Sequence, residues 1–179
     1  HGYHMGITAE NVAEKFQVTR EDQDKFALKS QEKALIAQKQ KKFNNEIIDF
    51  NIKSKKAEIN FNRDEHPREG INLEALSRLK PVFKKNGTVT AGNASGINDG
   101  AAAVVLMSGE QATKKGIQKL VTIKSWASCG VDPALMGTGP IPSVKKAIDL
   151  AGWSINDVDL FEINEAFAAQ SIAVLKTLS

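Results

Sequence analysis

The sequence contains very little cysteine and no long apolar run. A single cysteine, Cys129, in 179 residues excludes an internal disulfide framework and favours a reducing compartment, so we expect a cytoplasmic protein. No stretch of about 18 apolar residues occurs, and we therefore expect no membrane span. Residues 1–5 lack the apolar core of a signal peptide.

An excess of one charge is also missing. The 24 basic side chains stand against 21 acidic ones, a net charge of +3, so we expect no nucleic-acid partner. A group of lysines is most simply a solvated surface, and contact with the phosphates of a nucleotide-bearing ligand is the minority interpretation; its members are Lys41, Lys42, Lys53, Lys55 and Lys56. The histidines His1, His4 and His66 lack metal-ligand spacing, so we predict no metal site.

The two ends predict an internal piece of a longer protein. The first residue is not methionine, and a predicted helix over 166–178 stops at Ser179 without a cap. The length suits one domain or slightly more.

Capping residues and periodicity define the elements of the first half. Thr8 starts one helix, and a variant capping box at residues 19–22 starts a second that reaches about Lys41. Alternating apolar residues predict two strands, possibly a hairpin, at 48–52 and 59–61. A short helix from Leu73 ends before Pro81.

After Gly87 the sequence becomes rich in small and apolar residues. Residues 101–106 predict a strand buried on both faces, and two more strands are expected at 120–126 and 159–163. Helices are expected between a capping box at 108–111 and Gly116, between Pro142 and Gly152, and over 166–178. This alternation predicts a layered α/β domain.

Three short segments could carry chemistry. The glycine- and asparagine-rich residues 90–103 allow close backbone approach to a ligand, although a tight turn is the simpler interpretation. The loop 136–142 feeds a helix N-terminus that could bind an anion or merely shape the backbone. Asn164 follows a predicted strand, where its amide could hold a water, donate to an oxyanion or cap the helix. We interpret Cys129 as a packed side chain rather than a nucleophile.

Taken together and in order, these segments closely resemble the thiolase family. The matching segments cover essentially the whole chain and include Gly-Asn-Ala-Ser-Gly-Ile-Asn-Asp-Gly-Ala-Ala-Ala at 92–103 and Asn-Glu-Ala-Phe-Ala-Ala at 164–169. The other matches lie at 3–13, 79–83, 126–142 and 152–170, and the nearest likeness is to biosynthetic acetoacetyl-CoA thiolases.

The resemblance implies a five-layered αβαβα core of two similar halves with an inserted α+β loop domain that covers coenzyme A. Residues 1–87 would be most of the loop domain, residues 88–117 would complete the N-terminal half, and residues 118–179 would begin the C-terminal half.

The implied reaction is a Claisen condensation of two acetyl-CoA molecules to acetoacetyl-CoA and CoA, or its reverse. The family uses a nucleophilic cysteine, a histidine that activates it and a second cysteine that moves a proton. None of these three motifs occurs here, and Cys129 matches neither cysteine motif. We therefore expect the isolated chain to be inactive. The resemblance also implies no permanently bound cofactor and a homo-oligomer for the full-length protein.

The resemblance assigns roles to individual residues. Asn164 matches the asparagine that fixes a water in the oxyanion hole. Bulky Met5 and Met136 would narrow the acyl pocket and favour a short acyl chain. The full set of expected substrate-binding residues is His4, Met5, Arg68, Phe83, Ala91, Ser95, Met136, Ala166 and Phe167.

Two functional hypotheses follow. The first is a piece of a working thiolase. The second is a non-catalytic module that still binds coenzyme A or a partner. Exposed apolar faces around Val104, Leu106 and residues 172–174 disfavour the second, because half of a two-half core would need a partner to cover them.

Overall fold

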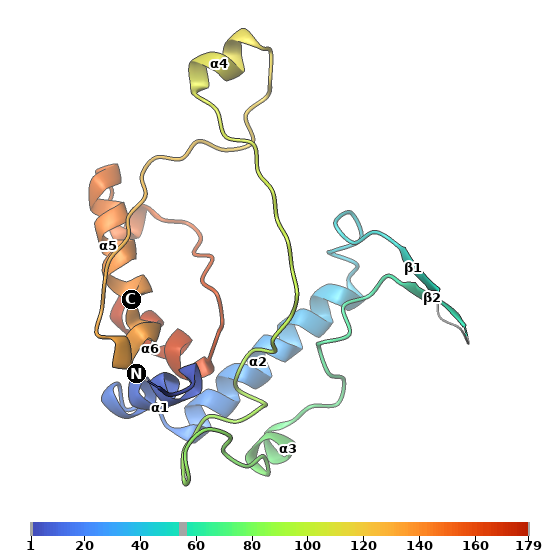
Figure 1. Ribbon diagram of the computed structural model, residues 1–179, viewed down its shortest axis with the longest axis vertical. Helices are drawn as coiled ribbons and strands as arrows, with labels where there is room; N and C mark the ends of the chain where they lie inside the picture. The colour runs from blue at the N-terminus through green and yellow to red at the C-terminus, as the bar shows by residue number, and fades with distance from the viewer. Residues whose placement is uncertain (1, 54–56, 179) are drawn as a thin grey trace.

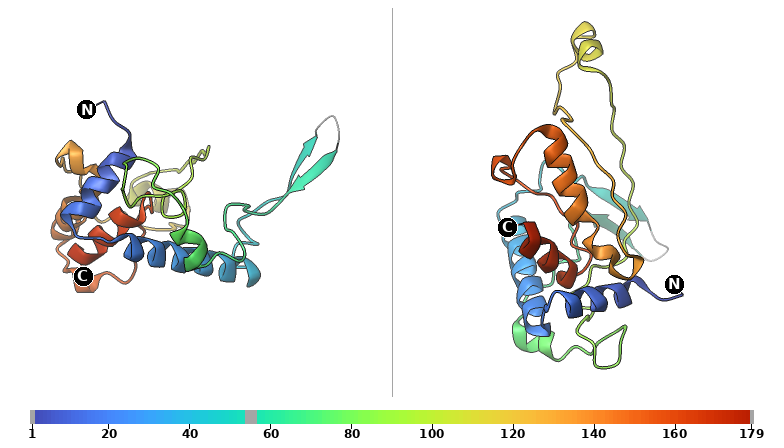
Figure 2. Two further views of the ribbon diagram at one scale, coloured as in Figure 1. Left: turned by 90° about the horizontal axis from the view of Figure 1, so that it is seen from below. Right: turned by 90° about the vertical axis from the view of Figure 1, so that its left-hand side faces the viewer.

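Three helices form the compact part of the molecule. The computed structural model describes residues 2–53 and 57–178. In it α6 (Ala168–Leu178) packs against both α1 (Met5–Lys15) and α2 (Arg20–Lys39). The last helix of the chain therefore lies beside the first two, as Figure 1 and both views of Figure 2 show.

Small aliphatic side chains fill the junction between these helices. Ala13, Val18 and Ala169 are buried there, and Phe16 and Ile172 cover them. Helix α2 buries only Gln23, Asp24 and Ala27 along its 20 residues. Its narrow apolar stripe therefore packs on a surface, as the sequence predicts.

The cap expected at Thr19 is formed, whereas the expected start at Thr8 is wrong, because α1 begins at Met5 and is capped by His4. At Thr19 the hydroxyl accepts a hydrogen bond from the Asp22 N–H, and the Asp22 carboxylate accepts one from the Thr19 N–H. This reciprocal pair satisfies two N–H groups that the helix leaves open. Helix α2 ends at Lys39, two residues before the predicted end, and Lys41 then adopts a φ of 58°.

The expected hairpin is confirmed and projects from the helices. Strands β1 (Phe50–Lys53) and β2 (Glu58–Phe61) are antiparallel, with Phe50 opposite Phe61. Every described residue of the pair is exposed, and the hairpin stands clear of the body in Figure 2. The chain then returns through α3 (Leu73–Ser77), which Asn72 caps.

Beyond residue 96 the chain makes a long extended excursion. Helix α4 (Gly109–Lys114) lies at its tip, at the top of Figure 1. Ser108 caps this helix, and Gly116 ends it with a φ of 64° that an L side chain rarely adopts. Both boundaries agree with the sequence.

The returning chain forms three further helical segments, of which the first packs against α1 and α6 and the second against α6. They are η1 (Pro133–Thr138), α5 (Pro140–Ala151) and η2 (Ile155–Asp157). Helix α5 begins two residues before the predicted Pro142, and Gly152 ends it as expected, with a φ of 72°. No helix within 2–53 and 57–178 is long and apolar enough to cross a membrane.

Three predicted strands are wrong as elements of this chain. Residues 101–106, 120–126 and 159–163 are extended but unpaired. Val104, Val105 and Leu120 are 81%, 85% and 95% exposed, so the expected burial on both faces is also wrong. A strand exists only where a neighbouring strand supplies hydrogen-bond partners. The only ladder among the described residues is β1–β2.

Candidate functional site

Two segments far apart in the sequence meet in a short antiparallel contact. Ala94 pairs with Phe167 in an isolated bridge. The Ser95 N–H donates to the Ala166 carbonyl at 3.0 Å, and the Ala168 N–H donates to the Asn93 carbonyl at 2.9 Å. The glycine-rich segment and the turn that carries Asn164 are thereby held side by side.

An aromatic stack lies next to this contact. The rings of His4 and Phe83 are stacked at a centroid distance of 4.7 Å, and Phe83 meets Phe167 edge-on at 6.3 Å. A Cβ at Gly6 would lie 2.2 Å from the Phe83 ring. A glycine at position 6 is therefore required for Phe83 to lie flat against the start of α1.

The imidazole of His4 has a defined orientation. Its Nδ1 accepts a hydrogen bond from the Gly6 N–H at 3.0 Å, so this nitrogen carries no proton. In the neutral ring the proton is then on Nε2, which can donate to a ligand. The same bond caps α1, so one contact sets both the helix start and the histidine tautomer.

A hollow of about 260 Å³ lies on the α2 side of the contact. Its wall contains Ser95, which is exposed, and Glu165. The Glu165 carboxylate accepts a hydrogen bond from the Ser30 hydroxyl at 2.9 Å. Loss of water around the carboxyl raises the pKa of Glu165, and the bond from Ser30 and the charge of Lys33 oppose that rise. The remaining lining residues are Ala27, Gln31, His66, Gly92, Asn93, Ala94, Gly96 and Asn98.

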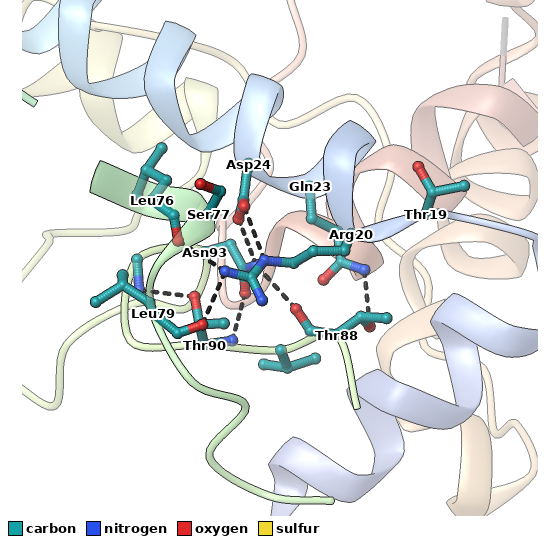
Figure 3. A network of polar contacts seen from close by, with 12 residues as sticks. Thr19, Arg20, Gln23, Asp24, Leu76, Ser77, Leu79, Thr88, Thr90 and Asn93 are labelled. Carbon is teal, nitrogen blue, oxygen red and sulfur yellow. Dashed lines mark hydrogen bonds and ion pairs between the residues drawn. The ribbon is translucent and has the colours of Figure 1, made fainter. Parts of the chain in front are cut away.

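A buried polar network holds the glycine-rich loop against α2 (Figure 3). The Asn93 amide donates to Asp24 at 3.0 Å, and Asp24 accepts from Arg20 at 2.7 Å. Arg20 also donates to the carbonyls of Leu76 and Leu79, at 2.7 and 3.0 Å. The network thereby joins α2 directly to α3, through Arg20 and Leu76, and directly to the loop, through Asp24 and Asn93.

A second buried carboxylate holds the start of the same loop. Glu10, 4% exposed, accepts from the N–H groups of Thr88 and Val89 at 2.8 Å. It also accepts from the Thr88 hydroxyl at 2.9 Å. Since Val82 pairs with Val89 through its N–H, this carboxylate anchors the turn that presents Phe83.

Sequence reasoning missed both clusters. From the sequence, Arg20 is only a member of the variant capping box at residues 19–22, and Glu10 is not singled out. The available signal was the (i, i+4) spacing of Arg20 and Asp24, on the helix face that carries Ala27. A single sequence gives no means of telling such a pair from one in solvent.

The structure brings five of the expected site residues into one connected group: His4, Phe83, Ser95, Ala166 and Phe167. The other five are exposed and lie around it. Met5 follows His4, Asn164 precedes the turn, and the Arg68 N–H donates to Gln31 on the rim of the hollow. Ala91 lies in the turn of the loop, and Met136 lies in η1.

The remaining sequence candidates are placed as follows. Cys129 is free and half-buried. Lys41, Lys42 and Lys53 are exposed, whereas Lys55, Lys56 and His1 lie outside the described residues. Within 2–53 and 57–178 no group of three or more His, Cys, Asp or Glu side chains could hold a metal ion.

Family models match both parts of the chain. Residues 1–110 match the model described as "Thiolase, N-terminal domain", and residues 117–179 match "Thiolase, C-terminal domain". Among curated proteins, an acetyl-CoA acetyltransferase of Rhizobium meliloti is 58% identical over 178 residues. A cytosolic acetyl-CoA acetyltransferase of Rattus norvegicus is 55% identical over 180 residues. Each match covers 99% of this chain and 45% of the relative, so the chain spans less than half the length of these proteins.

Solved structures share the path of the chain. The Bacillus anthracis acetyl-CoA acetyltransferase superposes with a TM-score of 0.92 and 50% identity, over 99% of this chain and 45% of that one. Human mitochondrial 3-ketoacyl-CoA thiolase gives 0.90 and 45%, over 97% and 44%. The expected fold, a partial thiolase-type α/β structure, is confirmed.

Proposed function

Because the chain belongs to the thiolase family, we propose that the full-length protein is an acetyl-CoA C-acetyltransferase. It joins two acetyl-CoA molecules to acetoacetyl-CoA and CoA by Claisen condensation, or runs the reverse thiolysis. The names of the relatives from Rhizobium meliloti and Bacillus anthracis support this activity. The substrate is a coenzyme A thioester, and no permanently bound cofactor takes part.

The observation that carries the proposal is the meeting of the aromatic stack with the paired segments. His4, Phe83 and Phe167 form an apolar wall, and Ser95 lies beside it through its bond to Ala166. An apolar wall with a few polar groups suits the pantetheine arm of coenzyme A. Arg68 is exposed and is attached through its backbone N–H to Gln31 of the hollow wall, and its cation suits the nucleotide phosphates.

Asn164 is the catalytic residue that this chain supplies. Its side chain is exposed and has no hydrogen-bond partner among the described residues, so its amide is open to a water or a thioester oxygen. Negative charge develops on that oxygen when the α-carbon loses a proton and the enolate forms. A hydrogen bond from a water held by Asn164 stabilises the negatively charged enolate oxygen more strongly than it stabilises the neutral carbonyl oxygen of the thioester.

The 179 residues do not carry the rest of the chemistry. Their single cysteine, Cys129, is half-buried in an extended segment and matches neither family cysteine. We therefore expect no turnover by the isolated chain. The proposed division into 1–87, 88–117 and 118–179 places the coenzyme A cover in the first part and Asn164 in the last.

The proposal also includes the acyl chain length, the cellular location and the oligomeric state of the full-length protein. Met5 and Met136, 54% and 46% exposed, flank the site and would favour a short acyl chain. The single cysteine and the names of the rat and mouse relatives support a cytosolic location. The full-length protein is expected to be a homo-oligomer.

The test is thiolysis of acetoacetyl-CoA by the full-length protein and by residues 1–179 alone. Activity is expected only from the full-length protein. Asn164→Ala should lower kcat by about 100-fold, the usual effect of losing one oxyanion donor. Full activity of Asn164→Ala, or none in the unmodified full-length protein, would contradict the proposal.

The second candidate is a module that binds coenzyme A without turnover. The intact aromatic wall within this chain favours it as an alternative. It predicts that CoA binds residues 1–179 alone and raises their melting temperature, while thiolysis by the full-length protein stays at background. Measurable turnover would exclude it.

A further inference from the structure

Asn93 occupies the point where the loop, α2 and the Asn164 turn converge. It is 3% exposed and contributes to the wall of the hollow, but the polar atoms of its side chain are bonded to the protein. Its amide nitrogen donates to Asp24 at 3.0 Å and to the Thr88 carbonyl at 3.1 Å. Its amide oxygen accepts from the Thr90 N–H at 2.8 Å. Both amide hydrogens are thus used, which fixes the orientation of the side chain.

The main chain of Asn93 begins the pairing with the other half of the site. Its carbonyl accepts from the Ala168 N–H at 2.9 Å, and the next two residues continue the contact through Phe167 and Ala166. Only two residues separate Asn164 from Phe167, so the position of the turn depends on this pairing.

The partner of Asn93 is itself firmly held. Asp24, 4% exposed, accepts from Arg20, and Arg20 donates to the carbonyls of Leu76 and Leu79 (Figure 3). A buried carboxylate with a charged partner and an amide donor has a single low-energy arrangement. Asn93 is therefore attached to a rigid anchor rather than to a mobile surface group.

We propose that Asn93 is a positioning residue that fixes the loop carrying Ala91 and Ser95 relative to the turn carrying Asn164. The consequence for catalysis rests on the proposed thiolase function. The loop lies beside the coenzyme A arm and the turn lies beside the reacting thioester, so their relative position sets the placement of the thioester carbonyl. A misplacement of about 1 Å is enough to cost about 100-fold in rate.

The first variant is Asn93→Asp in the full-length protein. It keeps the size of the side chain and the acceptor for Thr90, but places a carboxylate against Asp24 and the Thr88 carbonyl. We expect kcat for acetoacetyl-CoA thiolysis to fall by about 10- to 100-fold. We also expect KM to rise several-fold.

The double variant Asp24→Asn/Asn93→Asp tests the specific bond. It restores a hydrogen bond between positions 24 and 93 with donor and acceptor exchanged. KM and kcat should recover in part toward the unmodified values; the recovery stays partial because the carboxylate at position 93 still faces the Thr88 carbonyl. Failure of the pair to recover either constant counts against the proposal.

Gln23→Leu is the matched control. Gln23 is fully buried and donates to the Thr88 hydroxyl and the Val18 carbonyl, but Thr88 remains held by Glu10 without it. We expect a lower melting temperature with kcat and KM unchanged. The control thus separates loss of stability from loss of positioning.

Amide hydrogen exchange decides the inference independently of activity. In Asn93→Asp the N–H groups of Ser95 and Ala168 should exchange faster, while those of α1 stay protected. Unchanged exchange at both amides, with kcat and KM as in Gln23→Leu, overturns the proposal. If the unmodified protein has no thiolase activity, the proposed function fails. The exchange rates of the Ser95 and Ala168 amides still test whether Asn93 holds the loop against the turn. If Asn93→Asp does not fold, the double variant is compared with Gln23→Leu in the same measurements.

Discussion

The helical body and the excursion over residues 97–132 make different use of apolar residues. In the body, Val12, Ala169 and Val174 are fully buried, so the exposed apolar face expected at residues 172–174 is wrong: α1 and α2 cover it. In the excursion, Val104 and Val105 are 81% and 85% exposed. Apolar composition alone therefore does not decide burial, because a second surface must be present to cover the residue.

The two regions also differ in where their backbone N–H and carbonyl groups find hydrogen-bond partners. A helix satisfies most of its N–H and carbonyl groups within one segment, so α1, α2 and α6 need only side-chain contacts to assemble. An extended segment needs a neighbouring strand for the same groups. The superposition on solved thiolases nevertheless shows that the excursion follows the path seen in those proteins.

The largest predicted effect is that of Val105→Glu in the excursion, on the folding of the full-length protein and of the isolated chain. In the proposed full-length protein residues 101–106 form a covered strand, and a buried carboxylate there should abolish folding. In the isolated chain the side chain is already 85% exposed, so the melting behaviour should not change. Circular dichroism melts of both proteins measure the difference.

Lys119→Glu is the control for this prediction. It changes charge at an exposed position of the same excursion and should leave both proteins folded. If Val105→Glu were tolerated in the full-length protein, the covered strand would be ruled out.

The second prediction concerns the polar part of the body. Glu10→Ala removes the acceptor for two N–H groups and one hydroxyl of residues 88–89. We expect a loss of about 3 kcal/mol, because buried donors lose their partner. Denaturant unfolding of the full-length protein measures it. Glu14→Ala, at an exposed side chain paired with Lys84, should change stability by less than about 0.5 kcal/mol.

The third prediction concerns the contact between α1 and the aromatic stack. Gly6→Ala places a methyl group 2.2 Å from the Phe83 ring, so the ring must move away from His4. We expect about 2 kcal/mol of destabilisation, as for overpacked cores, together with a higher KM for acetoacetyl-CoA. Gly109→Ala in the excursion meets no atom within 4 Å and should affect neither. Equal effects of the two variants would show that Gly6 has no special role.

The fourth prediction concerns the start of α2. Thr19→Ala breaks the capping box and should cost about 1 kcal/mol. Hydrogen bonds from Thr19 hold the pKa of Asp22 below its ordinary 3.8. This contribution is present above the ordinary pKa and is lost as pH falls through the lowered one. The stability difference between Thr19→Ala and the unmodified protein should therefore shrink in acid, as unfolding at neutral pH and near pH 3 would reveal.

The smallest prediction concerns Glu165. Loss of water raises its pKa above the ordinary 4.5, so the folded state binds its proton more tightly than the unfolded state does. Its contribution to stability is therefore largest at low pH and is lost as pH rises through the raised value. Glu165→Gln should remove this dependence. In Ser30→Ala the pKa of Glu165 should rise further, since the opposing hydrogen bond is gone, and carboxyl NMR titration measures both.

Local chemistry was predictable where a few neighbouring residues decide the outcome. The capping box at Thr19, the Ser108 cap of α4 and the glycine helix ends at 116 and 152 are formed as expected, although Ser108 makes a single bond to the Gln111 N–H rather than the predicted reciprocal box. The strands over 101–106, 120–126 and 159–163 were not, because their pairing depends on residues outside each segment.

The site divides in the same way. The resemblance to thiolases pointed to His4, Phe83 and Phe167, and in the structure Phe83 stacks on His4 and meets Phe167 edge-on. It did not point to Glu10, Asp24 or Asn93, because a charged or amide side chain is expected to be exposed to solvent unless its hydrogen-bond partners are known. Their burial became visible only with the loop 88–96 in place.

The sequence by itself determined most of the helices, the caps at Thr19 and Ser108, the two strands of the hairpin and the family. Each of these depends on residues within a few positions of one another or on motifs read in order. The tertiary structure alone decided that residues 93–95 pair with 166–168 and that two carboxylates are buried beneath them. Those contacts join segments about 70 residues or more apart, and their energy depends on the exclusion of water, which no local pattern records.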